Sequence, residues 1–307
     1  MNILITGSQG FVGENLKEYF EKKNENQILA PLIEDLNLTD PVSVKHYFNN
    51  NNVEYIIHSA TTEPKNKEYP KDVCESNVKM FFNILRYKSK NSHMMNLGSG
   101  SEYSRPSWVP QMKEEYFDQH IPEDSHSYSK YIISKAIEIL NDKKITNLRI
   151  FGIFGKYEDY TNKFISNCIV KNLCGLPIKI NQNVIYDYIY IKDFCRIVEY
   201  LINNKATNST MNVTPTDSID LISINSYIQS ILSISPNLEI MKEGYGKEYT
   251  GDNSVLLKNL GNFEFTPIKE SIEELINYYK ENLSMIDHEK VLEDKFFEYA
   301  KKINKKN

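Results

Sequence analysis

Two side chains near the middle of the chain have the types and the spacing that proton transfer needs. Tyr131 and Lys135 stand four residues apart in a stretch, 127–140, whose apolar pattern predicts a helix, so both project from one face. A phenol has a pKa near ~10 in water, and a neighbouring ammonium lowers it by favouring the phenolate. The pair is therefore suited to exchange a proton with a carbonyl or alcohol oxygen.

Ser99 is a third candidate, because it comes just after the predicted strand 93–97. Open α/β sheets bind ligands at the carboxyl ends of their strands, where a serine hydroxyl can hold the same substrate oxygen. Taken singly, a Tyr-x-x-x-Lys pair on a helix is usually exposed on the surface without a catalytic role, and a serine after a strand is usually a turn residue. Tyr128 is a decoy, since Ile132 stands where its lysine would be.

The first thirteen residues, MNILITGSQGFVG, predict a strand, a turn and the start of a helix. Gly7, Gly10 and Gly13 follow a short apolar run at three-residue spacing, and residues 14–23 have a helical apolar pattern. Glycines in that context permit a tight turn and a close backbone approach to a diphosphate at the helix N-terminus. The plainer alternative is an ordinary βα turn.

The elements that follow alternate between strand and helix. Further strands are expected at 27–33, 53–60, 93–97 and 147–151, with helices at 42–48, 72–88 and 127–140. This order predicts a Rossmann-like, doubly wound parallel sheet of the α/β class. After Gly155 the pattern weakens, and we expect helices at 163–173, 194–203 and 268–282 and strands at 177–180 and 185–191.

We therefore expect a dinucleotide-binding part and a smaller C-terminal substrate-binding α/β part. The first comprises 1–160 with roughly 184–204, the second 161–183 with 205–285, and 286–307 forms a helical tail.

Composition narrows the class of protein. A net charge of −5 over 307 residues offers no basic field for nucleic acid, and no window is apolar enough to span a membrane. Four cysteines show neither a CxxC pair nor a metal-ligand spacing, which favours reduced thiols in a cytoplasmic protein without a metal.

The motifs, taken in order, resemble those of the extended short-chain dehydrogenase/reductase superfamily. They are GSQGFVG, DLNLTD, HSAT, Asn77, GSGSEY, YIISK and RIFGIFG. Within it, the chain looks most similar to GDP-L-fucose synthase and related 4-keto-sugar-nucleotide reductases, a likeness that covers most of residues 1–200.

The resemblance implies a role for each matching residue. Ser99, Tyr131 and Lys135 would form the catalytic triad, and Tyr131 and Lys135 would also contact the cofactor. The other implied cofactor-binding residues are Gly7, Gly10, Phe11, Val12, Gly13, Asn37, Leu38, Ser59, Ala60, Thr61 and Asn77. The family implies NADP(H) or NAD(H). The choice stays open, because the lack of a cation after the second strand to pair with a 2′-phosphate favours NAD(H), whereas the resemblance to reductases favours NADPH. Family members are typically homodimers.

Two departures from the family narrow the expected reaction. Ser101 and Lys163 stand where fucose synthases carry the cysteine and histidine that epimerise C3 and C5, and both are expected to contact substrate. We therefore expect NAD(P)H-dependent reduction of the C4 keto group of a GDP- or dTDP-linked deoxy-sugar or related sugar, without that epimerisation. The alternatives are an NAD-dependent nucleotide-sugar C4 epimerase and a non-catalytic NAD(P)-binding protein.

Overall fold

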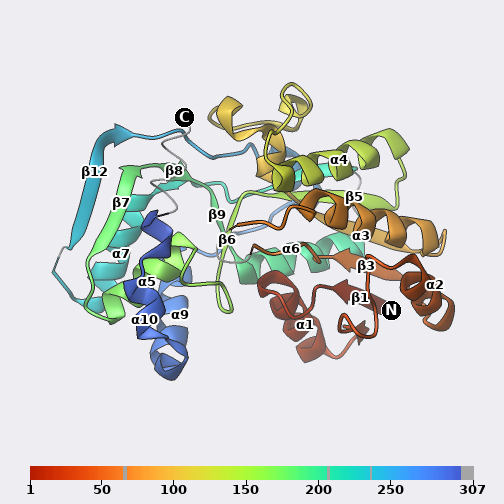
Figure 1. The fold of residues 1–307 in the computed structure, drawn as a ribbon, viewed down its shortest axis with the longest axis horizontal. Helices are drawn as coiled ribbons and strands as arrows, with labels where there is room; N and C mark the ends of the chain where they lie inside the picture. The colour runs from red at the N-terminus through yellow and green to blue at the C-terminus, as the bar shows by residue number, and fades with distance from the viewer. Residues whose placement is uncertain (65–67, 206–207, 236, 299–307) are drawn as a thin grey trace.

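Six parallel strands form the central sheet in the computed structural model, which describes residues 1–64, 68–205, 208–235 and 237–298. Their spatial order is β2-β1-β3-β4-β5-β10, so the sheet doubles back beside the first strand (Figure 1). The strands are β1 (Asn2–Thr6), β2 (Gln27–Leu29), β3 (Tyr55–His58), β4 (His93–Ser99), β5 (Ile145–Ile150) and β10 (Thr210–Val213). The predicted Rossmann-like α/β class is confirmed.

Alternating side chains along the strands divide the core between the two faces of the sheet. Ile3 and Ile5 pack on the face covered by α1 (Phe11–Lys23) and α6 (Ile191–Asn204). Leu4, between them, packs on the opposite face. The helices that cover that face are α2 (Pro41–Asn50), α3 (Val73–Tyr87) and α4 (Ser125–Leu140). Both faces are thus buried, as parallel sheets require.

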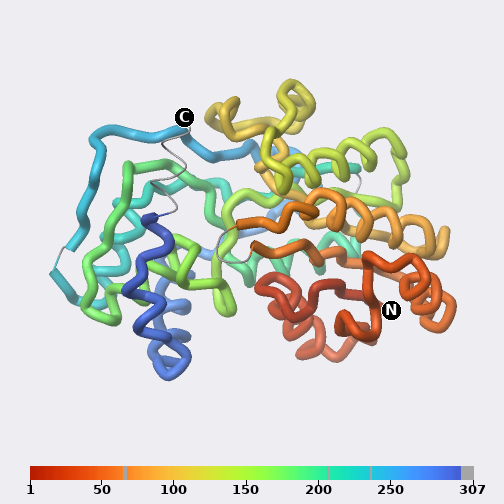
Figure 2. Tube along the Cα trace, viewed as in Figure 1, coloured from red at the N-terminus to blue at the C-terminus, as the bar shows by residue number. Residues whose placement is uncertain are grey.

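A smaller α/β part lies beside this sheet (Figure 2). Its strands pair as β7 (Ile178–Asn183) with β12 (Leu238–Tyr245), β8 (Ile185–Tyr186) with β11 (Ile219–Asp220), and β6 (Gly152–Phe154) with β9 (Tyr188–Tyr190). Its helices are α5 (Phe164–Leu173), α7 (Leu221–Leu232), α9 (Ile268–Glu281) and α10 (His288–Leu292), whereas α8 (Ser254–Leu260) packs on α6 and β10 beside the central sheet. Short 3-10 turns are η1 (Gly100–Tyr103), η2 (Arg105–Ser107), η3 (Glu114–Tyr116) and η4 (Leu283–Met285).

Three expectations need correction. The strand expected at 27–33 ends at Leu29, because Pro31 has no N–H to give to the ladder and the chain turns at Leu32. The strand expected at 185–191 is two short strands, and Ile191 already opens α6. β10 joins the central sheet although it lies in 205–285, the stretch assigned to the substrate-binding part. Of the expected tail, α10 is helical, and 299–307 lie outside the described residues.

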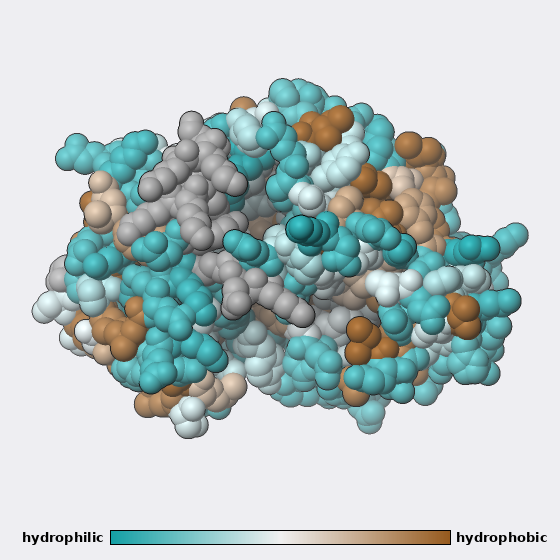
Figure 3. Space-filling view, viewed as in Figure 1, coloured by the Kyte–Doolittle hydropathy of each residue, from teal (hydrophilic) through white to brown (hydrophobic). Residues whose placement is uncertain are grey.

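The surface in Figure 3 is mostly hydrophilic, with hydrophobic side chains gathered in small separate groups. Among the described residues, the helices are too short or too polar for any of them to cross a bilayer.

Candidate active site

The glycine turn has the geometry of a phosphate cradle. Gly7 adopts φ +67°, and a Cβ there would lie 2.7 Å from the Ala60 Cα, too close for any side chain. A Cβ on Gly13 would lie 2.1 Å from the Gly7 carbonyl oxygen. Gly10 caps α1 without a side chain, so the first amides of that helix remain available to an anion. These features fit the diphosphate of a dinucleotide, although each glycine also serves the packing of β1 and α1.

The segment after β3 lies against this turn and is fixed by Asn77. The Asn77 side-chain oxygen accepts hydrogen bonds from the Thr62 amide at 2.8 Å and the Thr61 hydroxyl at 3.4 Å. Its amide nitrogen donates to the Ser129 hydroxyl on α4 at 3.0 Å. Asn77 therefore ties the predicted cofactor segment, Ser59 to Thr61, to helix α4.

The predicted adenine-side residues lie in the loop between β2 and α2. The Asn37 side-chain oxygen accepts hydrogen bonds from the Thr39 amide at 3.0 Å and from the Thr39 hydroxyl at 2.8 Å. The Leu38 side chain is buried, and its carbonyl accepts from Asn83 on α3 at 2.8 Å. The loop is thus held rigidly by side chains that the sequence pattern did not single out.

Ser99 is the last residue of β4 and stands at the carboxyl edge of the sheet, where it was expected. Its hydroxyl accepts a hydrogen bond from the Ser101 amide at 3.2 Å and interacts with the Tyr249 phenol. The Ser101 hydroxyl is buried and has no partner among the described residues. Two hydroxyls, one of them unsatisfied, therefore lie together at the end of β4.

A buried ion pair holds Ser99 in place. Glu102 accepts from the Ser99 amide at 2.9 Å and from the Arg149 Nε at 2.7 Å, with 0% and 1% of the two charged side chains exposed. A Cβ on Gly98 would lie 2.5 Å from the Glu102 carboxylate, so glycine is needed there. The sequence analysis did not single out Glu102 for this role. The Ser-x-x-Glu spacing of a capping box was the available signal.

Tyr131 and Lys135 lie side by side on α4, as predicted, and both bind Asp118 in the segment between η3 and α4. The phenol donates to one Asp118 oxygen, and the Lys135 ammonium donates to the other at 2.8 Å. The hydrogen bond to the Asp118 carboxylate raises the pKa of Tyr131 to about 12. Among the described residues, neither side chain hydrogen-bonds to Ser99. Nothing in the sequence pointed to Asp118, because its segment has no regular pattern.

A second pair lies on the same helix one turn earlier. Lys130 donates to the Leu97 carbonyl at 2.9 Å, two residues before Ser99, and His126 stands four residues before Lys130. Lys163, predicted to contact substrate, is the N-cap of α5, and its charge reaches His126. The sequence analysis did not single out Lys130.

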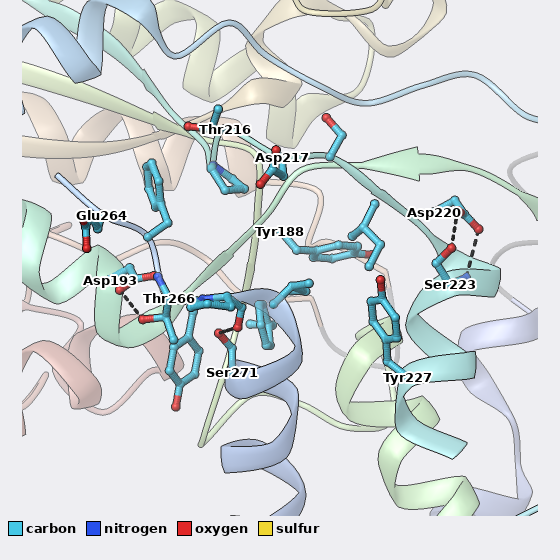
Figure 4. A pocket seen from close by; sticks show the side chains of 18 of the residues that line it. Tyr188, Asp193, Thr216, Asp217, Asp220, Ser223, Tyr227, Glu264, Thr266 and Ser271 are labelled. Atoms are coloured by element: carbon cyan, nitrogen blue, oxygen red, sulfur yellow. Dashed lines mark hydrogen bonds between the residues drawn. The ribbon is translucent and has the colours of Figure 1, made fainter. Parts of the chain in front are cut away.

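A separate cavity of about 810 Å³ opens between β9, α7 and the start of α9 (Figure 4). Tyr188, Asp193 and Tyr227 are among the residues that line it, and none of the predicted site residues does. The Asp193 carboxylate accepts a hydrogen bond from the Thr266 amide at 2.7 Å and so fixes the segment that precedes α9. The cavity is thus distinct from the edge of the sheet where Ser99 lies.

Comparison with known proteins places this geometry in a family. Residues 3–214 match the NAD dependent epimerase/dehydratase family. GDP-6-deoxy-D-talose 4-dehydrogenase of Aggregatibacter actinomycetemcomitans is 24% identical over 302 residues, covering 92% of this chain and 98% of the relative.

Two solved structures share the fold over nearly the whole chain. A GDP-L-fucose synthetase from Naegleria fowleri bound to NADP has a TM-score of 0.80 and 17% identity, covering 92% of this chain and 93% of that one. A GDP-mannoheptose C4 reductase from Campylobacter jejuni with NADP bound has a TM-score of 0.76 and 18% identity, covering 91% and 98%.

The family match spans more than half of the chain and includes the glycine turn, Ser99, α4 and β5. The chain therefore belongs to the NAD dependent epimerase/dehydratase family, the extended short-chain dehydrogenases/reductases, whose members use NAD(H) or NADP(H).

Proposed function

We propose that this protein reduces the C4 keto group of a nucleotide-activated deoxy-sugar or related sugar. The observation that carries the proposal is the pair of hydroxyls at the end of β4. Ser99 is held there by Glu102, and the Ser101 hydroxyl, at the position where an epimerising relative has a cysteine, has no partner among the described residues. A serine is a poor base at neutral pH, so the site favours reduction without C3/C5 epimerisation.

The names of three relatives support the class of substrate. A 4-dehydrogenase of a GDP-deoxy-sugar, a GDP-L-fucose synthetase and a C4 reductase of a GDP-heptose all have names that point to nucleotide-linked sugars. A GDP-linked 4-keto sugar is accordingly the first substrate to test, with the dTDP-linked sugar second.

The chain's own residues would act as follows. The turn from Gly7 to Gly13 holds the diphosphate of NAD(P)H, and the bound cofactor supplies a hydride. Ser99 donates a hydrogen bond to the C4 oxygen and keeps it at the end of β4. The proton comes from helix α4, where the sequence predicts Tyr131 with Lys135 as donor. That assignment remains a prediction, and it requires Asp118 to release both groups.

The test is turnover by the purified full chain. We expect it to oxidise NADH or NADPH in the presence of a GDP- or dTDP-linked 4-keto-6-deoxy sugar, and to form one reduced sugar per cofactor consumed. Ser99→Ala should lower kcat by about 10²-fold, the order of losing one preorganised donor. Interconversion of two sugar nucleotides without net cofactor turnover would instead establish the C4 epimerase.

A further inference from the structure

Two exposed cations from distant parts of the chain meet just beyond the end of β4. Arg105 opens η2, and Lys247 follows β12. The Lys247 ammonium donates a hydrogen bond to the carbonyl of Pro106, the residue after Arg105, across 141 positions of the sequence. Among the described residues, neither cation forms an ion pair with a carboxylate. Unpaired positive charges that the fold gathers in one place favour the binding of an anion.

An aromatic stack joins these cations to Ser99. The Arg105 guanidinium lies 4.8 Å from the centre of the Trp108 ring, and that ring stacks on Tyr249 with centroids 4.0 Å apart. The Tyr249 phenol in turn hydrogen-bonds to the Ser99 hydroxyl. Burial raises the pKa of the phenol, whereas the Ser99 hydrogen bond and the charge of Arg105 lower it. The cations therefore lie at the outer end of a continuous line of contacts that begins at Ser99.

Hydrogen bonds hold the two segments together as one unit. The Met112 amide donates to the Thr250 carbonyl at 3.1 Å, and the Asp252 amide donates to the Met112 carbonyl at 2.9 Å. The Thr250 hydroxyl donates to Glu248 at 2.6 Å, which engages the carboxylate that is next to Lys247 in the sequence. The backbone that carries both cations is thus in place before a ligand binds, and this lowers the entropic cost of binding.

Two buried donors beside the stack lack a partner. The Trp108 side chain is 8% exposed, and among the described residues its Nε1–H has no hydrogen-bond acceptor. The Ser101 hydroxyl, two residues beyond Ser99, is buried and lacks a partner as well within the same part of the chain. Buried donors without acceptors cost free energy, which the oxygens of a bound ligand would recover. The site therefore combines positive charge with unused donors, and both favour a ligand rich in oxygen.

A diphosphate ester matches these groups. A guanidinium binds phosphate oxygens through parallel N–H bonds, and an ammonium adds a point charge. In a nucleotide-linked sugar the diphosphate is attached at C1, across the ring from C4. A C4 oxygen held by Ser99 therefore directs the diphosphate away from the end of β4, toward the outer end of the stack where Arg105 and Lys247 lie.

We infer that Arg105 and Lys247 bind the diphosphate of the nucleotide-linked substrate, and that the sugar spans the stack of Trp108 and Tyr249 to reach Ser99. This site is separate from the glycine turn, which holds the diphosphate of the cofactor. The inference rests on the proposed function for the identity of the sugar. Binding of a nucleoside diphosphate, however, is measurable without any reduction.

The fluorescence of Trp108 tests the inference directly, because Trp108 is the only tryptophan of the chain. The full chain is titrated with GDP while an excess of oxidised cofactor fills the glycine turn. We expect a saturable change in the tryptophan emission, and the same change with inorganic pyrophosphate. Guanosine, which lacks phosphate, should bind at least about tenfold more weakly than GDP. Equal binding of guanosine and GDP would place the nucleobase at the stack and overturn the inference.

Substitution of each cation provides the second measurement. Arg105→Met and Lys247→Met should each weaken GDP binding by at least about tenfold, measured by isothermal titration calorimetry with the same excess of cofactor. In turnover, each should raise KM with little change in kcat, since the diphosphate is bound equally in the ground and transition states. The matched controls, which should change neither quantity, are Arg86→Met and Lys242→Met. The Arg86 guanidinium lies 5.3 Å from the centre of the Tyr87 ring on α3, and Lys242 is exposed on β12.

Binding and turnover keep the two proposals apart. If the two substitutions weaken GDP binding but no 4-keto sugar is reduced, the proposed function fails and the diphosphate site stands. If both variants reduce a GDP-linked sugar with the KM of the native enzyme, the inference is wrong and the proposed function stands. A GDP affinity that neither substitution changes would overturn the inference as well.

Discussion

Replacing Glu102 by glutamine tests how the residues around Ser99 are held. The native carboxylate is fully buried and binds both the Arg149 guanidinium and the Ser99 amide. Arg149 has two further hydrogen bonds, at 2.7 Å to the Tyr103 phenol and 3.0 Å to the Ser134 hydroxyl, but among the described residues it hydrogen-bonds to no other carboxylate. The substitution therefore leaves a buried positive charge without its counter-ion.

The expected cost follows from that burial. Removing one partner of a buried ion pair typically costs about 3–5 kcal/mol, because the remaining charge is desolvated without compensation. For a chain of this size, that loss corresponds to a fall in Tm of roughly 5–8 °C. The capping bond to Ser99 weakens as well, so kcat should fall even at temperatures where the variant is folded.

Calorimetry and urea unfolding measure the effect, with Glu75→Gln as control. The Lys79–Glu75 pair is exposed, at 55% and 64%, and its loss should cost less than about 1 kcal/mol. The double variant Glu102→Leu with Arg149→Met should recover most of the stability, since it removes both charges, but not the activity. A fall in Tm of less than about 2 °C in Glu102→Gln would refute the reasoning.

Two further predictions concern the cradle and a buried acid. Gly7→Ala should weaken NAD(P)H binding at least about tenfold by isothermal titration calorimetry, whereas Gly175→Ala, at a similar φ of +70° but in open space, should not. Burial raises the pKa of Glu158 to about 8, so the folded state binds a proton that the unfolded state releases above its ordinary pKa of 4.5. The free energy of unfolding should therefore fall between pH ~5 and 8 by up to about 1.4 kcal/mol per pH unit, as measured by urea unfolding at a series of pH values. Glu158→Gln should abolish this slope. An equal slope in the native protein and in the variant would show that Glu158 ionises normally.

Local signals sufficed for much of the nucleotide-binding half. The glycine spacing, the apolar strand before it and the position of Ser99 after β4 each depend on a few adjacent residues. What was missed depends on contacts between distant parts of the chain. Glu102 and Arg149 are 47 residues apart and both look like surface charges in the sequence, and β10 has only four residues with no distinctive pattern. The pairing of Glu102 with Arg149 and the place of β10 in the central sheet both depend on burial in the folded protein, which no local sequence pattern indicates.

Helix α4 shows where residue type and position diverge. The sequence favoured Tyr131 and Lys135 because a phenol and an ammonium at that spacing have an obvious chemistry. A helix presents its sheet-facing side once every 3.6 residues, and the contacts of Lys130 with Leu97 and of Ser134 with Arg149 put that side at 130 and 134. Tyr131 follows Lys130 by about 100° around the axis and meets Asp118 instead. Which side chain of α4 transfers the proton stays a prediction, and the contact of Tyr131 and Lys135 with Asp118 is the feature that no local pattern in the sequence indicates.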